Sequence, residues 1–252
     1  MNHCKNCQYP ADLNFCSNCG QKTHTLRLNL SEIIRELPKS VFHIDKGILF
    51  NLTQLFKRPG PAISDYIEGK RKYFFHPVSY LVLALILNYL VMKVTDMHYF
   101  DAQELLTMSP EKAKAIQKYD ATQWWFLEHT YLYILLAVPL STFFLFIIFK
   151  IAGQFYNLAE SAVVVFFTIA QGVIIQSILY FSFGWVRSGP FIRTIELINT
   201  ILLVLYASYV LFQLTSTLKI KFLRASLALI AGLGLFASWL ASAYILHFLF
   251  GE

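Results

Sequence analysis

The sequence predicts an all-α polytopic membrane protein with five transmembrane helices and a small cysteine-rich module at its N-terminus. Hydrophobic residues make up 56% of the 252-residue chain and charged residues only 14%, whereas about 25% of the residues of a soluble domain are charged. Five apolar runs approach or exceed the length of about 20 residues that a helix needs to cross a bilayer. All four cysteines precede these runs, which sets the N-terminal segment apart.

Residues 1–22 contain two Cys-x-x-Cys pairs: Cys4, Cys7, Cys16 and Cys19. Two thiolates at this spacing bind one edge of a tetrahedral ion, and a second pair completes the site. Gly20 follows the second pair, where a tight turn is needed. We therefore predict a zinc ribbon with these four cysteines as ligands. Because four protein ligands leave no position for water or substrate, the zinc is expected to be structural and required for folding of the module.

Other uses of the cysteines are alternatives to zinc. Two disulfides are disfavoured, because the chain opens without an apolar signal segment and its N-terminus is expected in the reducing cytosol. A redox Cys-x-x-Cys would need one pair beside a βαβ pattern, which the sequence lacks. Four thiolates also suit a mononuclear iron site, although zinc is the commoner occupant. His3 and His24 flank the cysteines and are interpreted as surface residues.

Residues 23–74 are expected to form an amphipathic juxtamembrane region. Between residues 43 and 57, apolar residues recur at helical spacing, which predicts a helix along the cytoplasmic leaflet. The apolar face has Ile44, Ile48, Leu52, Leu55 and Phe56. The opposite, polar face has Asp45, Lys46, Asn51, Gln54 and Lys57. The Arg58-Pro-Gly-Pro61 motif is expected to end this helix in a turn, before a second short helix over residues 62–68.

A basic cluster follows, formed by Lys70, Arg71 and Lys72. Each cation beside an anionic leaflet contributes about 1 kcal/mol of attraction, so we predict that the cluster contacts membrane lipids. The simpler alternative is that the cluster only sets the topology of the first span.

Several motifs in this half of the chain resemble one known family. They are Cys-x2-Cys, Phe15-Cys-x2-Cys-Gly-Gln21, Phe42-His43, Thr53-x-Leu55, Arg58-Pro-Gly60, Tyr66-Ile-x-Gly69-Lys-Arg71 and His76-Pro77. The family consists of uncharacterised bacterial inner-membrane proteins with an N-terminal zinc ribbon followed by a domain of unknown function. The resemblance covers about residues 1–80 and extends weakly to Tyr156-Asn157-x2-Glu160. The resemblance implies a zinc ribbon followed by a membrane domain, and it implies no particular activity. A fainter similarity, in span count and topology only, is to the five-span Yip1-type trafficking proteins.

Residues 75–252 are predicted to form the five-helix transmembrane domain. The spans are expected at residues 75–93, 130–150, 160–183, 194–214 and 225–249. Pro139 should kink the second span. The long loop over residues 94–129 contains Ser109-Pro110-Glu111, a typical helix start that predicts a short helix over residues 110–119.

Basic residues beside the spans predict the orientation of the chain, because short cytoplasmic loops are enriched in lysine and arginine. They precede span one and occur between spans two and three and between spans four and five: Lys57, Arg58, Lys70, Arg71, Lys72, Lys150, Lys219, Lys221 and Arg224. The loop over residues 94–129 is instead rich in acidic residues. The N-terminus is therefore predicted to be cytoplasmic and the C-terminus external, with residues 94–129 as an external loop.

Polar residues inside spans are costly in lipid and often functional. Five of them fall in the outer part of the predicted spans: Asn88, Gln176, Glu196, Asn199 and His247. They are candidates for an outward-facing intramembrane polar pocket that binds a small molecule or a lipid headgroup, with Tyr131 or Tyr133 in its wall. Hydrogen bonding between helices is the alternative explanation.

Two further features of the spans have structural explanations. Glu160 at the start of the third span is expected to complement the helix dipole. Gly234, Ser238 and Ser242 recur every fourth residue in the fifth span and mark a close-packing face, either within the bundle or between copies.

No catalytic motif is visible in the sequence, neither HExxH, GxSxG, a P-loop nor a dinucleotide fingerprint. We therefore predict a non-enzymatic scaffold, sensor or assembly factor whose zinc ribbon docks a cytosolic partner. A transporter or lipid-handling protein that uses the outer pocket is the main alternative, and an enzyme acting on a lipid or envelope substrate is a third. A homo-oligomer is compatible with the sequence. Nucleic acid is disfavoured, because the ribbon has only Lys5 and Lys22 against Asp12.

Overall fold

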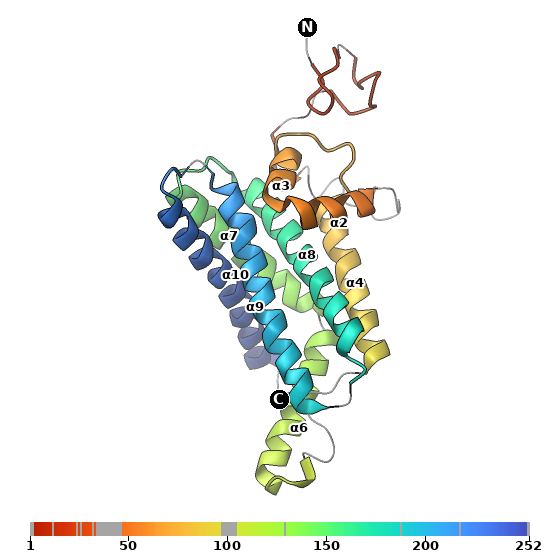
Figure 1. Cartoon of the computed structure of the whole chain (residues 1–252), viewed down its shortest axis with the longest axis vertical. Helices are drawn as coiled ribbons and strands as arrows, with labels where there is room; N and C mark the ends of the chain where they lie inside the picture. Colours follow the sequence, from red (N-terminus) through yellow and green to blue (C-terminus); the bar gives the residue numbers. More distant parts are fainter. Residues whose placement is uncertain are drawn as a thin grey trace.

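The computed structural model describes residues 3–11, 13–23, 25, 27–31, 33, 47–96, 105–128, 130–186, 188–216 and 218–250. Within its helices, the side chains of residues 119, 120, 123, 124, 126–128, 130–133, 247, 249 and 250 are not described. The described residues form eight helices and two isolated β-bridges. Figure 1 shows an elongated molecule with the N-terminal segment at one end and helix α6 (Pro110–Glu128) at the other.

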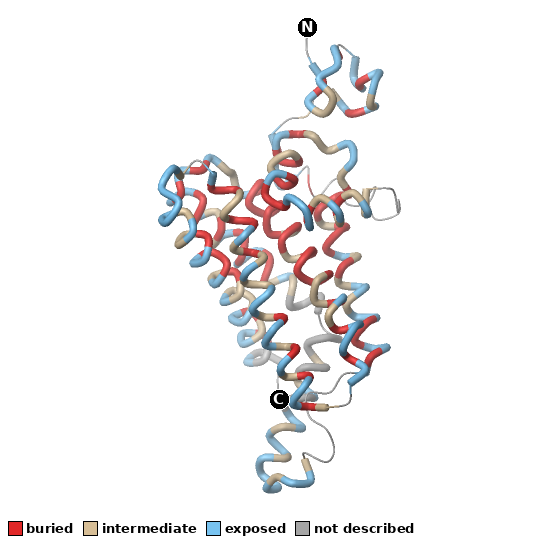
Figure 2. Tube along the Cα trace, viewed as in Figure 1, coloured by how far each residue is buried: buried red, intermediate tan, exposed pale blue. Residues whose placement is uncertain are grey.

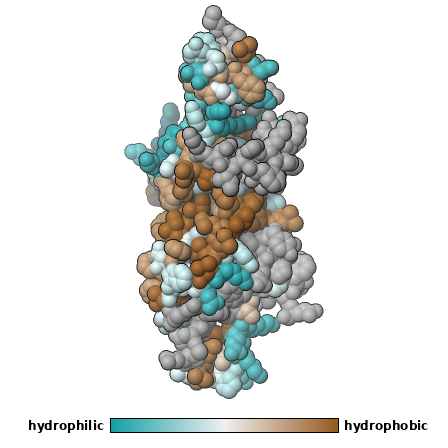
Figure 3. Space-filling view, turned by 90° about the vertical axis from the view of Figure 1, so that its right-hand side faces the viewer, coloured by the Kyte–Doolittle hydropathy of each residue, from teal (hydrophilic) through white to brown (hydrophobic). Residues whose placement is uncertain are grey.

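Five helices are long and apolar enough to cross a membrane, as the sequence predicts. They are α4 (Pro77–Thr95), α7 (Thr130–Ile151), α8 (Leu158–Phe183), α9 (Gly189–Leu214) and α10 (Lys221–Phe250). Figure 3 shows the corresponding surface, a hydrophobic band at mid-height with hydrophilic residues above and below it. Such a band matches the apolar solvent that a bilayer provides.

Helix α8 is the centre of the bundle. It packs against α4, α7 and α9, while α10 closes the ring by packing against α7 and α9. In α8, 67% of the most apolar stretch is buried, against at most 39% in the other four spans. Figure 2 shows this concentration of buried residues along α8. Side chains of α8 therefore contact neighbouring helices, whereas the outer faces of α9 and α10 are free to contact lipid.

Small residues let α10 approach its neighbours closely. A Cβ atom at Gly232 would lie 2.2 Å from Oγ of Ser208 on α9, and one at Gly234 would lie 2.1 Å from the Phe144 ring on α7. Ser238 shares a hydrogen bond of 2.7 Å with Ser141 of α7. The close-packing face of the fifth span thus operates within the bundle.

Two short helices form a platform between the bundle and the N-terminal segment, α2 (Gly47–Lys57) and α3 (Pro59–Ile67). The sequence predicts a turn over Arg58-Pro-Gly-Pro61, but only Arg58 separates the helices and the prolines lie in the first turn of α3. Proline is well tolerated there because the first N–H groups of a helix have no intrahelical acceptor. The backbone N–H of Gly60 donates instead to Oε1 of Gln213 on α9, at 2.7 Å.

The placement of Asn51 on the exposed polar face of α2 is wrong. Asn51 is fully buried, and its amide donates to the carbonyl of Phe75 at 3.0 Å while accepting from its N–H at 3.1 Å. These two bonds satisfy the backbone N–H and the carbonyl of Phe75, which lies just before α4 and has no helical hydrogen-bond partner. Helical spacing places Asn51 on the polar face, but spacing alone cannot distinguish an amide that faces water from one that bonds a neighbouring loop. Ile44, Asp45 and Lys46 lie outside the described residues.

Aromatic packing joins the platform to the bundle. The Tyr66 ring of α3 contacts Phe167 of α8 edge-on at 5.3 Å and Phe74 at 5.6 Å, and Phe167 also neighbours Tyr80 of α4. The hydroxyl of Tyr206 on α9 donates to the Leu55 carbonyl of α2 at 3.2 Å. The two platform helices are therefore part of the same hydrophobic core as the spans.

The helix in the segment between α4 and α7 is longer than the sequence predicts. We expected it over residues 110–119, whereas α6 runs to Glu128. Pro110 begins it as expected, but residues 120–128 contain no glycine or proline that would stop it. Pro139 lies inside α7, as expected.

Candidate metal centre and intramembrane cavity

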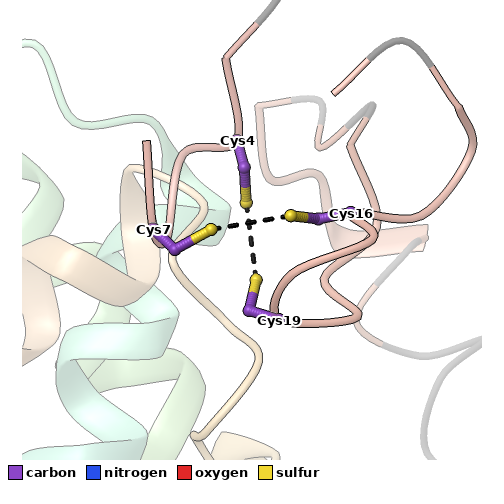
Figure 4. A group of neighbouring side chains, drawn as sticks. All are labelled: Cys4, Cys7, Cys16 and Cys19. Carbon is purple, nitrogen blue, oxygen red and sulfur yellow. Dashed lines mark hydrogen bonds between the residues drawn. The ribbon is translucent and has the colours of Figure 1, made fainter. Parts of the chain in front are cut away.

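The four cysteines converge on one point. Their sulfur atoms all lie within 4.8 Å of one another, with Cys4 and Cys19 at 3.6 Å and Cys7 and Cys16 at 3.5 Å. Figure 4 shows the four side chains directed at a common centre from two loops. This arrangement provides four ligand atoms for a metal ion. Among the described residues no histidine joins the group, and His3 is exposed.

The two loops that carry the cysteines have nearly the same backbone. In the first, the N–H of Gln8 donates to the Cys4 carbonyl at 2.9 Å, and in the second the N–H of Gly20 donates to the Cys16 carbonyl at 2.7 Å. Gln8 and Gly20 both have positive φ values, of 61° and 71°. The predicted tight turn at Gly20 is present, and Gln8 adopts the same left-handed turn although it carries a side chain.

Gln21 attaches the cysteine loops to the membrane domain. Its Nε2 donates to the Gly69 carbonyl at 2.7 Å, and its Oε1 accepts from the backbone N–H of Lys72 at 3.2 Å. Gln21 is buried. Gly69 has a φ of 104°, and a Cβ atom there would lie 2.6 Å from Oγ1 of Thr25. The turn after α3 must therefore carry a glycine for the N-terminal segment to pack this closely.

A second attachment joins the N-terminal segment to the start of α8. Arg27 makes two hydrogen bonds with the Glu160 carboxylate, at 2.8 and 2.9 Å, and another with the Phe155 carbonyl. The bond with Glu160 raises the pKa of Arg27 above its ordinary value. Glu160 also forms a capping box with Asn157, which satisfies the first N–H groups of the helix. The sequence indicates the cap but contains no signal for Arg27.

The basic cluster makes contacts within the protein. Lys70 pairs with Asp65 at 2.5 Å, and this hydrogen bond raises the pKa of Lys70. The Arg71 guanidinium donates to the Tyr66 carbonyl and lies over its ring. Lys72 is exposed and bonds Gln21 through its backbone. Contact of these three cations with lipid headgroups stays a prediction.

Three of the five polar candidates line one cavity. Gln176, Glu196 and Asn199 border a space of about 160 Å³ between α8, α9 and α10. Asn88 does not border it, and its amide donates instead to the Ser177 hydroxyl at 3.3 Å. The side chains of His247, Tyr131 and Tyr133 lie outside the described part of the chain.

A hydrogen-bonded chain runs along one side of this cavity. The Gln176 amide donates to the Tyr180 hydroxyl at 3.1 Å, and that hydroxyl donates to Oε2 of Glu196. Thr168 also lines the cavity and is buried. Neither Tyr180 nor Thr168 has a distinct signal in the sequence, because a threonine hydroxyl in a span usually bonds its own helix and tyrosine is common at membrane interfaces.

Comparison with known proteins identifies one stretch of the chain. Residues 45–88 match the model of a family described as a protein of unknown function, DUF3667. These residues comprise α2, α3, the turn with Gly69 and Lys72, and the first part of α4. No curated protein and no solved structure matches the chain. We expected a domain of unknown function in this part of the chain, and the match agrees with that expectation. The family description assigns no activity.

Proposed function

We propose that this chain is a non-enzymatic integral protein of a bacterial inner membrane that holds a zinc ribbon on the cytoplasmic face, where the ribbon docks a cytosolic protein. Five apolar helices and the hydrophobic band support the membrane assignment. The observation that carries the proposal is the attachment of the ribbon through Gln21, which fixes its position above the platform. A module held in place in this way is suited to present a binding face in one orientation.

Zinc is the proposed occupant of the four-cysteine centre. Zinc–sulfur bonds of about 2.3 Å in a tetrahedron place the sulfurs about 3.8 Å apart, and the closest pairs here are 3.5 and 3.6 Å apart. Four thiolates saturate the ion, so its contribution is to stabilise the ribbon fold.

The distribution of basic residues supports a cytoplasmic ribbon. Arg27 contacts the start of α8, and Gly60 contacts the last turn of α9, so these helix ends lie on the ribbon side of the bundle. The helix ends and loops on that side contain Lys150, Lys219, Lys221 and Arg224 in addition to the basic residues of the platform. Short loops enriched in lysine and arginine are typical of the cytoplasmic side.

Exposed apolar side chains on the ribbon support a protein partner. Leu13 is 70% exposed, Phe15 61% and Tyr9 49%. In Figure 1 the ribbon lies beyond α2 and α3, away from the apolar band of the bundle, so lipid does not cover these side chains. Exposed apolar groups on a small rigid module are typical of a protein interaction site.

Site-specific photo-crosslinking in living cells tests this proposal. A photo-reactive residue in place of Phe15 in the full-length chain should give a discrete adduct with a cytosolic protein. The same residue in place of Leu106, which is 86% exposed at the opposite end of the molecule, should not.

The captured protein is then purified and bound to the full chain in nanodiscs. The double variant Leu13→Ser, Phe15→Ser should bind at least about tenfold more weakly, a loss of about 1.4 kcal/mol, with unchanged zinc content. Leu106→Ser should bind like the wild type. Adducts only with lipid, or equal binding by both variants, would refute docking through the ribbon.

A further inference from the structure

Gln21 contacts both the four-cysteine centre and the membrane domain. Its backbone N–H donates a hydrogen bond to the sulfur of Cys19. Its buried side chain bonds the turn after α3 twice, because Nε2 donates to the Gly69 carbonyl at 2.7 Å and Oε1 accepts from the backbone N–H of Lys72 at 3.2 Å. A residue that bonds a ligand atom orients that ligand, and its loss weakens metal binding.

The position of the Gln21 side chain depends on the fold of the cysteine loops. The N–H of Cys16 donates to the Gln21 carbonyl at 2.8 Å, and the N–H of Gly20 donates to the Cys16 carbonyl at 2.7 Å. Among the described residues, the apolar cluster of these loops contains only Ala11 besides the cysteines. So small a core does not hold its fold once the metal is removed. Loss of the metal should therefore release Gln21 from the turn after α3.

Both cysteine loops pack closely against this turn. A Cβ atom at Gly69 would lie 2.6 Å from Oγ1 of Thr25 and 3.1 Å from Cδ of Lys5, and one at Gly20 would lie 3.4 Å from Nζ of Lys72. Lys5 belongs to the first loop and Gly20 to the second. Unfolding of either loop would therefore disturb the contact with the membrane domain.

We propose that metal binding and docking of the ribbon on the membrane domain are one coupled equilibrium, and that Gln21 couples them. This inference rests on the proposed function, because it concerns how the partner-binding face of the ribbon is held. With zinc bound, Gln21 bonds Gly69 and Lys72, and the face keeps one orientation. Without zinc, the ribbon is released and the orientation is lost. Because coupling is reciprocal, docking also raises the affinity of the ribbon for zinc.

Hydrogen–deuterium exchange tests whether zinc controls docking. The full chain in nanodiscs is compared with and without a chelator, and mass spectrometry with electron-transfer fragmentation resolves single amides. The Lys72 N–H should exchange at least about tenfold faster without zinc, because its acceptor is Oε1 of Gln21. The Phe75 N–H is the matched control. Its acceptor is Oδ1 of Asn51 on α2, so its exchange rate should not change.

Zinc affinity tests the reverse direction of the coupling. It is measured for the full chain by competition with a chromophoric chelator. Gln21→Ala should bind zinc at least about tenfold more weakly than the wild type. Tyr9→Ala is the matched control and should bind zinc like the wild type. The N–H of Cys4 donates to the Tyr9 carbonyl at 2.9 Å, as that of Cys16 does to Gln21, but the Tyr9 side chain is 49% exposed.

Gly69→Ala distinguishes this coupling from a local role of Gln21 within the ribbon. The substitution lies outside the ribbon, and its Cβ atom would clash with Thr25. It should also weaken zinc binding several-fold. The double variant Gln21→Ala, Gly69→Ala should bind zinc no more weakly than the weaker single variant, because both changes remove the same contact. Circular dichroism of each variant shows that the helices are intact.

The outcomes separate this inference from the proposed function. If zinc is bound but the chelator leaves exchange at Lys72 unchanged, or if Gly69→Ala binds zinc as tightly as the wild type, the coupling is overturned alone. A wild-type chain that purifies without stoichiometric zinc would refute the zinc centre and the coupling together. Neither measurement includes the cytosolic partner, so the results do not depend on whether that partner binds.

Discussion

The imidazole of His76 lies in an apolar environment at the start of α4. His76 is 8% exposed, and neither ring nitrogen has a hydrogen-bond partner among the described residues. Burial, together with the positive charge of Arg71, lowers the pKa of His76 from 6.5 to about 4. The ring is therefore neutral in the folded protein at neutral pH, whereas the unfolded chain takes up a proton below about pH 6.5.

Stability should consequently fall on acidification over this pH range. Because the unfolded state binds more protons between pH 6.5 and about 4, the free energy of unfolding should drop by about 2 kcal/mol as the pH falls to about 5. His76→Phe should lose less stability over the same range. Thermal unfolding of the wild type and the variant in detergent at about pH 7.5 and 5 measures the difference. Identical losses in the two proteins would show that His76 is not buried neutral.

Residue-level prediction from sequence succeeded where the determining pattern is local. The spacing of Cys4, Cys7, Cys16 and Cys19 identifies four residues that the fold brings together. In contrast, Arg27 is 133 positions from Glu160, and no local pattern connects them. Asn51 was misplaced because its partner is the backbone of a distant loop. Long-range polar contacts require the packed structure and cannot be inferred from periodicity.

Helix packing depends on glycines that face a neighbouring helix. At Gly232 a Cβ atom would meet Oγ of Ser208 at 2.2 Å and the Val204 carbonyl oxygen at 3.0 Å. The second contact is with backbone, which cannot rotate away. An added methyl group would therefore push α9 and α10 apart.

The variant Gly232→Ala should be destabilised by about 1–3 kcal/mol through overpacking, in spite of the roughly 1 kcal/mol that alanine gains over glycine in a helix. Ala237→Val on the exposed side of α10 is the matched control and should change stability by less than about 0.5 kcal/mol. Thermal unfolding in detergent compares the two. Equal effects would contradict close contact between α9 and α10 at this position.

The bounds of a helix could be predicted only where the sequence contains a residue that begins or ends a helix. The number of long apolar helices follows from run length, which the bilayer imposes. The end of α6 could not be predicted, because the residues after position 119 have no strong helix breaker. The predicted start of α3 was wrong because prolines such as Pro59 and Pro61 occur both in turns and in the first turn of a helix. The hydrogen bond between Gly60 and Gln213 favours the helix here.

At the scale of the molecule, the structure joins the four-cysteine loops, the platform of α2 and α3 and the helix bundle into one continuous unit. The platform packs on the spans through Tyr66 and Phe167, and the cysteine loops bond to the platform through Gln21. The matched family covers the platform and the start of α4. This part of the chain connects the spans with the cysteine loops, and Gly69 lets the N-terminal segment pack closely against it.

Sidedness of the cysteines tests the central claim most directly, because every cysteine of the chain lies in the ribbon. Inside-out and right-side-out vesicles from a bacterial host that expresses the full chain are treated with a chelator and then with a membrane-impermeant maleimide. We expect labelling in inside-out vesicles alone, and only after the chelator has removed the metal. Labelling of right-side-out vesicles, or equal labelling of both, would contradict a five-span protein with its metal ribbon on the cytoplasmic face.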